Sequence, residues 1–127
     1  MVLTGYVLSG LIGVGILFIG SRFLWDPAAA AGGFGIPNSP SPSTGFTAWL
    51  AVKGVRDIVS GLFVFLLMAS GPPRLLGQFM LAASLIAMAD AATVLRSGGG
   101  RTVAFGIHGL TALVIIAAGA CLIGAAN

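Results

Sequence analysis

The chain has 127 residues, of which 57% are hydrophobic and only 7% are charged. Because a soluble domain carries about 25% charged residues, this composition excludes an ordinary water-exposed surface. Six basic residues against three acidic ones give a pI near 10.0, but they form no basic run with an aromatic platform, so nucleic acid is not expected as a partner. The composition predicts an integral membrane protein, with residues 1–127 as a single transmembrane domain.

Four apolar runs are each long enough to cross a hydrocarbon core of about 30 Å, which takes about 20 helical residues. The sequence therefore predicts an all-α fold, an antiparallel bundle of four membrane helices. We expect these helices at approximately residues 5–24, 44–68, 74–95 and 102–125.

Small residues recur at every fourth position of the first run, at Gly5, Ser9 and Gly13. Such a face lets another helix approach closely. The third run has alanines at the same spacing, at positions 83, 87 and 91. We expect both faces to pack inside one bundle; the alternative for the first is the seam of a homodimer.

The segment 25–43 separates the first two runs and contains four prolines and three glycines, so it cannot be helical throughout. Its apolar stretch Phe34-Gly-Ile-Pro37 can return toward the membrane surface. Two interpretations stay open: a plain connection anchored by Trp25, or a lid over a cavity, since long loops in compact domains are often functional.

The second run contains three charged residues, Lys53, Arg56 and Asp57. Each costs about 2.5–3.5 kcal/mol near the centre of a membrane helix. Together with Trp49 they follow the spacing i, i+4, i+7 and i+8, which places them on one side of a helix. We expect this side to face the interior of the bundle.

Other polar residues lie in the same half of the membrane. At about 1.5 Å per residue, Asp90 and His108 lie about 8–9 Å from the face that bears the first and third loops, and Arg22 lies one turn from it. The sequence therefore predicts a buried polar cavity shared by the second, third and fourth helices, with Arg22 near its mouth. A network that only locks the bundle is the alternative.

The residue types suggest two kinds of role in such a cavity. Carboxylates and an imidazole move protons, and cations hold anionic groups. The candidate catalytic residues are Asp57, Asp90 and His108, and the candidate ligand-binding residues are Trp49, Lys53, Arg56 and Arg22. Two nearby cations disfavour a metal at the three candidate catalytic residues, so no metal is expected. Cys121 stands alone, no cofactor motif is present, and no cofactor is expected.

Several stretches together resemble a known family. They are Arg22-Phe-Leu-Trp-Asp-Pro27, Phe34-Gly-Ile-Pro37, Lys53-Gly-Val-Arg-Asp57, Asp90 and His108. This pattern is similar to that of the small four-helix bacterial membrane proteins of the uncharacterised DUF4267 family, whose layout broadly resembles that of DoxX-like proteins. The resemblance covers nearly the whole chain and implies a four-helix membrane fold, but it implies no activity.

Three functions follow as hypotheses. The first is a membrane protein whose polar pocket binds a lipophilic small molecule with a polar or anionic head, with or without acid–base chemistry on it. The second is a proton-coupled small transporter that acts as a dimer, although the first run contains no acidic residue. The third is a structural or accessory subunit. Whether the protein is an enzyme is left open.

The distribution of arginine predicts the orientation in the membrane. Arg22, Arg96 and Arg101 flank the first and third loops, whereas Arg74 lies on the side of the termini. By the positive-inside rule, we expect a multi-pass protein of the bacterial inner (cytoplasmic) membrane, in contact with the lipid bilayer, with both termini facing outward.

Overall fold

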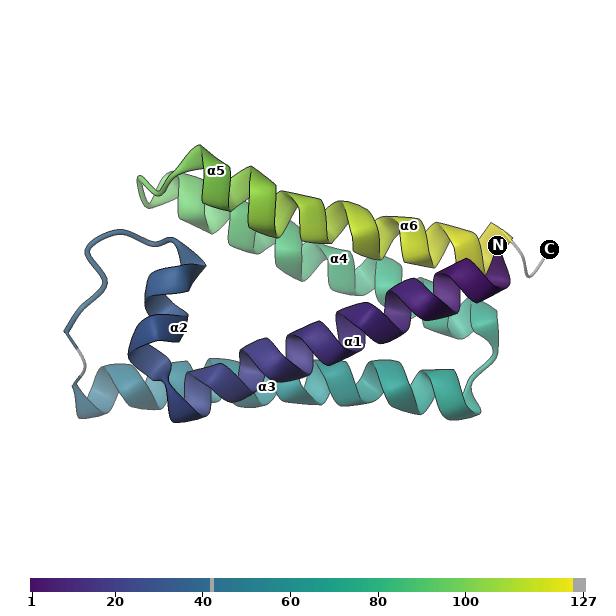
Figure 1. The fold of residues 1–127 in the computed structure, drawn as a ribbon, viewed down its shortest axis with the longest axis horizontal. Helices are drawn as coiled ribbons and strands as arrows, with labels where there is room; N and C mark the ends of the chain where they lie inside the picture. The colour runs from purple at the N-terminus through teal and green to yellow at the C-terminus, as the bar shows by residue number, and fades with distance from the viewer. Residues whose placement is uncertain (42, 125–127) are drawn as a thin grey trace.

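The computed structural model describes residues 1–41 and 43–124, and all regular secondary structure within them is helical. The elements are α1 (Val2–Trp25), α2 (Pro27–Phe34), α3 (Thr44–Ser70), α4 (Pro73–Arg96), α5 (Arg101–Val103), the π-helical turn η1 (Ala104–Gly109) and α6 (Leu110–Gly124) (Figure 1). The all-α prediction is therefore confirmed for the described residues.

The predicted helices are present with ends shifted by a few residues, but the simple bundle of four helices is not confirmed in that form. An additional helix, α2, lies in the first connection, and the last rod consists of α5, η1 and α6. Among the described residues, α1, α4 and the rod from Arg101 to Gly124 are long and apolar enough to cross a membrane. The 27-residue helix α3 is not among them, because three charged residues lie near its middle.

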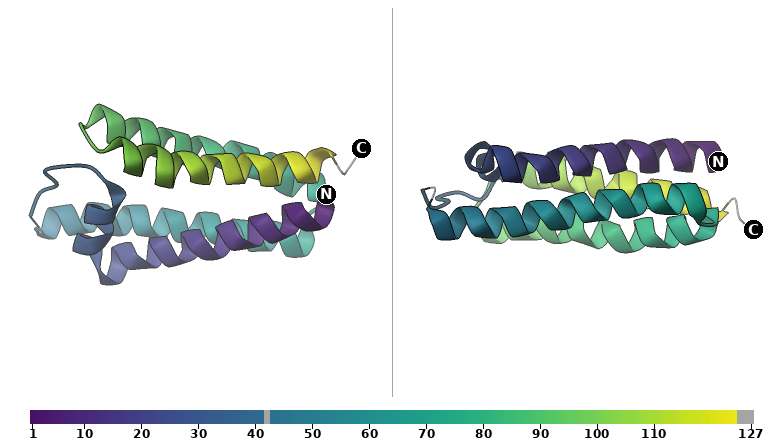
Figure 2. Two further views of the ribbon diagram at one scale, coloured as in Figure 1. Left: turned by 45° about the horizontal axis from the view of Figure 1, so that its top comes forward. Right: turned by 90° about the horizontal axis from the view of Figure 1, so that it is seen from below.

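The long helices form two pairs, because α1 packs along α3 and α4 packs along α6. Consecutive long helices run in opposite directions, and residues 1 and 124 lie at the same end (Figure 1). The pairs meet there through α1 and α6, where Gly5 contacts Leu122. They diverge toward the other end, where α2 stands between them (Figures 1 and 2).

Glycines hold α1 against α3. A Cβ atom at Gly54 would lie 2.6 Å from the carbonyl oxygen of Gly20, so the two backbones touch there. One further contact of this kind joins Gly61 to Gly13 two turns away. The small face predicted at Gly5, Ser9 and Gly13 is buried within the chain, as small residues permit.

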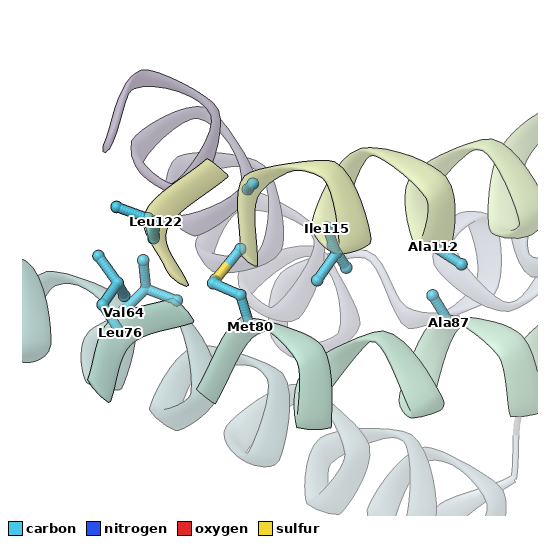
Figure 3. Packing of buried hydrophobic residues seen from close by; sticks show 8 residues of the cluster. Val64, Leu76, Met80, Ala87, Ala112, Ile115 and Leu122 are labelled. Carbon is cyan, nitrogen blue, oxygen red and sulfur yellow. The ribbon is translucent and has the colours of Figure 1, made fainter. Parts of the chain in front are cut away.

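The apolar core lies toward the end that bears the termini. Leu76 and Met80 of α4 face Ile115 and Leu122 of α6 (Figure 3), and Leu76, Met80 and Leu122 are fully buried. Val64 of α3 completes this layer. Because these side chains fill the space between the pairs, that end of the molecule is closed.

The segment 25–43 is not helical throughout, as the sequence predicts, but it contains the helix α2 at Pro27–Phe34, which the sequence pattern does not indicate. The Asp26 carboxylate accepts a hydrogen bond from the backbone N–H of Ala29, and Pro27 occupies the first turn, where its missing N–H is not needed. Gly35 ends the helix with φ +96°, a conformation that favours glycine. The backbone of Gly35 also lies against the side chain of Val103, and this contact holds the end of α2 against the second helix pair.

Gly54→Ala is expected to lower the stability of the protein in detergent by about 1–3 kcal/mol, because the added methyl group meets the Gly20 backbone. Gly15→Ala is the matched control, because a Cβ atom at Gly15 has no atom within 4 Å. Thermal unfolding of both variants checks this contact; equal stability of the two would contradict it.

Candidate functional site

An inner cavity of about 220 Å³ lies between the two helix pairs. Its long walls are apolar and include Ile12 and Ile16 of α1, Phe79 of α4 and Ile115 of α6. Its polar lining consists of Lys53, Asp57, Ser60, Asp90, His108 and Thr111. The polar groups thus come from α3, α4, η1 and α6, as the sequence predicts for Lys53, Asp57, Asp90 and His108.

Lys53 is held by an anion and two aromatic rings. Its Nζ atom lies 2.7 Å from Oδ2 of Asp57, one helical turn away, and the Asp57 side chain is 11% exposed. The same ammonium lies 5.0 Å from the ring centroid of Phe23 and 5.3 Å from that of Phe34. Such cation–π contacts strengthen where water is excluded. Lys53 and Asp57 therefore neutralise each other, and the lysine joins α3 to both α1 and α2.

His108 connects α2 to the second helix pair. Its Nε2 atom donates a hydrogen bond to the carbonyl oxygen of Phe34 at 3.0 Å, and the two rings lie 4.8 Å apart with their planes tilted by 53°. His108 lies in the π-helical turn η1, and such turns occur frequently at functional sites. Because Phe34 is the last residue of α2, its carbonyl oxygen has no N–H of a following helical turn to accept from and accepts the hydrogen bond from His108 instead.

Asp90 is the second acidic residue of the site, and its side chain is partly buried. Within residues 1–41 and 43–124 its carboxylate forms no hydrogen bond and no salt bridge. It lines the inner cavity and a second, outer cavity of about 400 Å³ beneath the connection between α2 and α3. Lys53 and Phe34 also line both cavities. These three side chains therefore stand at the boundary between the two spaces.

The structure does not bring all of the predicted residues to the cavities. Trp49 is 75% exposed, Arg56 is exposed, and neither lines either cavity. The buried positions of α3, which show the side that faces its neighbours, are Gly54, Asp57, Gly61 and Val64. Arg56 precedes Asp57 by one residue, which is about 100° around a helix, so it points outward. The predicted single inward face is therefore wrong for Trp49 and Arg56.

Arg22 also stays outside both cavities. It lies 3.6 Å from the carboxylate of Asp26 at the end of α1, and its guanidinium lies 5.9 Å from the ring centroid of Trp25. Both partners are local, so Arg22 is satisfied at the helix end and does not line either cavity.

Sequence reasoning missed the two aromatic rings around Lys53. Phe34 was recognised only as part of an apolar stretch, and nothing in the spacing of Phe23 distinguishes it from the other phenylalanines of the chain. A usable signal was present in the glycines: Gly13 and Gly20 on one helix match Gly54 and Gly61 on the other at the same seven-residue spacing. That match orients α3 and hence excludes Arg56 from the interior.

Asp57, Asp90 and His108 share the inner cavity but do not form a metal-binding group. Among the described residues, no three histidine, cysteine or acidic side chains come close enough to hold a metal ion. Because the charges of Lys53 and Asp57 cancel, Asp90 and His108 are the ionisable groups of the lining that remain to interact with a molecule in the cavity.

The inner cavity opens on the outer surface through apolar side chains. Leu11 and Ile19 of α1 line the cavity and are also 66% and 50% exposed, and Ile107 of η1 is likewise 50% exposed. On the side of α4, Ile86 lines the cavity and is 46% exposed. The mouth between the helix pairs is therefore hydrophobic.

This fold and site define a small all-helical protein with membrane-span-like helices around a cavity that is polar at one end. Residues 13–122 match the family described as Domain of unknown function (DUF4267), and the chain belongs to this family. The resemblance to this family that the sequence shows is thus confirmed. No curated protein and no solved structure matches the chain.

Asp57→Asn is expected to lower the stability in detergent by about 2 kcal/mol, because it leaves the Lys53 ammonium without its anion. The value is below the about 3–5 kcal/mol of a fully buried pair because the Lys53 side chain is 30% exposed. The double variant Lys53→Gln/Asp57→Asn removes both charges and should recover most of the loss. Additive losses in thermal unfolding would show that the two residues do not act as a pair.

Proposed function

We propose that the protein crosses the membrane four times, through α1, α3, α4 and the rod formed by α5, η1 and α6. Three of these meet the requirements of length and hydropathy by themselves. The crossing of α3 is supported by its packing. This helix lies beside α1, with backbone contacts between Gly20 and Gly54 and between Gly13 and Gly61. Its 27 residues extend about 40 Å at about 1.5 Å per residue, enough to cross.

Within this membrane protein, the inner cavity binds a lipophilic small molecule that carries a polar head. The observation that carries this proposal is a cavity with apolar walls and an apolar mouth whose lining also includes Asp90, an acid without a partner among the described residues. A mouth lined by Leu11 and Ile107 would face hydrocarbon, so a lipophilic molecule reaches the cavity directly from the bilayer. Ionisable residues at this depth are by default functional.

The volume limits the size of this molecule. A dry cavity of about 150 Å³ in another protein holds a benzene molecule. The inner cavity of about 220 Å³ therefore suits a single ring with a short substituent, or a short alkyl chain. A larger molecule would extend through the mouth into the bilayer or past Phe34 into the outer cavity.

The charges of the site favour a head that donates hydrogen bonds, such as a hydroxyl or an amine. The sequence favoured a polar or anionic head because it placed both Lys53 and Arg56 inside. Arg56 lies outside, and Lys53 is neutralised by Asp57 at 2.7 Å, so the support for an anionic head falls away. Asp90 accepts a hydrogen bond or a proton from the head, and His108 beside it supplies an acid–base partner.

Thermal stabilisation of the purified protein by three eight-carbon probes tests this proposal. Octylamine and octanol are expected to raise the unfolding temperature in a concentration-dependent way, and octanoate is not. Octylamine should stabilise the protein more than octanol, because its ammonium group pairs with the Asp90 carboxylate, and Asp90→Asn should remove this difference. The comparison with octanoate controls for effects of the alkyl chain on the detergent micelle.

A cavity-filling variant separates binding in the cavity from adsorption to the surface. Gly15 lines the inner cavity and a Cβ atom there meets no other atom within 4 Å, so the larger side chain of Gly15→Phe is expected to fill the cavity. It should abolish the stabilisation by octylamine, whereas Val14→Phe, on the 59% exposed side of the same helix, should retain it. If both variants respond like the parent protein, the cavity is not the binding site.

The same measurements separate the alternatives. A structural or accessory subunit responds to none of the probes, although Asp57→Asn still destabilises it. A proton-coupled transporter moves octylamine across proteoliposome membranes in dependence on a pH gradient. No specific contact favours either alternative over a binding protein.

We also propose that the protein resides in the bacterial inner membrane with the α2 end toward the cytoplasm. Arg22, Arg96 and Arg101 lie at that end, and Arg74 lies at the other (Figure 1). Labelling of a cysteine introduced at the exposed Ser97, in a Cys121→Ala background, should require permeabilised cells. Labelling of intact cells by an impermeant maleimide would reverse the orientation.

A further inference from the structure

Arg56 is a charged residue on the outer face of a membrane helix. It is exposed, and its neighbours on that face of α3 are apolar: Val52, Val55, Val59 and Phe63 are all exposed. Within the described residues it forms no salt bridge, because Asp26 pairs with Arg22, Asp57 pairs with Lys53 and Asp90 lines the cavities. A charge that faces lipid is costly unless it finds a partner or extends to the membrane–water interface.

Two tryptophans locate this residue relative to the membrane surface. Trp25 lies five residues beyond Gly20 on α1, and Trp49 lies five residues before Gly54 on the antiparallel α3. Because Gly20 and Gly54 touch, the two tryptophans lie at the same level, and both are at least 65% exposed. Exposed tryptophans at one level mark the membrane–water interface. Arg56 follows Trp49 by seven residues and thus lies about 10 Å deeper.

The direction of the side chain brings the guanidinium back to that interface. Side chains on a helix tilt toward its N-terminus, and the N-terminus of α3 lies at the Trp25 and Trp49 end. Arginine also extends its aliphatic stem along apolar surface to place its charge in the headgroup region. The guanidinium of Arg56 therefore reaches toward the level of the lipid phosphates, next to Trp49 two turns along the same helix.

We propose that Arg56 and Trp49 form a binding site for the phosphate of a membrane phospholipid on the outer face of α3. The planar guanidinium donates paired hydrogen bonds to phosphate oxygens, and the indole lies against the headgroup. A second copy of the chain fits less well, because a symmetric α3–α3 contact would bring Arg56 toward Arg56 of the partner. The site rests on the proposed crossing of α3 but not on a ligand in the inner cavity.

Native mass spectrometry of the purified full-length protein tests the site. Palmitoyl-oleoyl phosphatidylglycerol is titrated onto the protein, and the diacylglycerol with the same chains and inorganic phosphate serve as comparison probes. Binding of the phospholipid should weaken about tenfold in Arg56→Gln, the loss that one charge-assisted hydrogen bond implies. Arg56→Lys should give an intermediate affinity because it keeps the charge without the paired donors.

Arg96→Gln is the matched control, because Arg96 is an exposed arginine at the same end of the molecule. It should bind the phospholipid like the parent protein. Equal phospholipid affinity of Arg56→Gln and the parent, or equal binding of the diacylglycerol, would overturn the proposal, as would a dimer that only the parent forms. If octylamine does not stabilise the parent protein but the phospholipid binds it, only the proposed function of the inner cavity is contradicted.

Discussion

The position of Lys53 constrains the rest of this structure. An ammonium group in the middle of a largely apolar helix needs compensation, and three side chains supply it: Asp57 on the same helix, Phe23 on α1 and Phe34 on α2. Phe34 reaches the lysine only because Asp26 and Pro27 start a new helix directly after α1 and Gly35 ends it. The need to satisfy one cation thus determines where α2 lies.

Helix α2 in turn keeps the two helix pairs apart. Its last residue, Phe34, contacts Lys53 on the first pair and accepts the hydrogen bond from His108 on the second. The pairs are joined by the apolar core at the other end, where Leu76, Met80 and Leu122 are fully buried. The inner cavity lies between this core and α2, and its polar residues Lys53, Asp90 and His108 lie beside Phe34 of α2. Fold and candidate site are therefore consequences of the same contacts.

The sequence predicts the parts of this arrangement that depend on local physics. Long apolar runs locate the four rods, and the depths of Lys53, Asp57, Asp90 and His108 bring them to one cavity. Prediction from the sequence fails where tertiary contacts determine which side of a helix is buried. Polar spacing alone cannot orient α3, because the close approach of Gly54 to Gly20 decides which side is buried and turns Arg56 outward. The contact of His108 with Phe34 depends on α2, whose segment 25–43 has prolines and glycines typical of a loop.

The central claim is that the space between the helix pairs is a binding cavity held open by α2. An experimental structure of the protein extracted from its native membrane tests this most directly. We predict non-protein density between Ile16 of α1 and Ile115 of α6, with its polar end at Asp90 and with Phe34 still bonded to His108. A structure in which the two pairs close against each other, so that their own side chains fill this space, would contradict the claim.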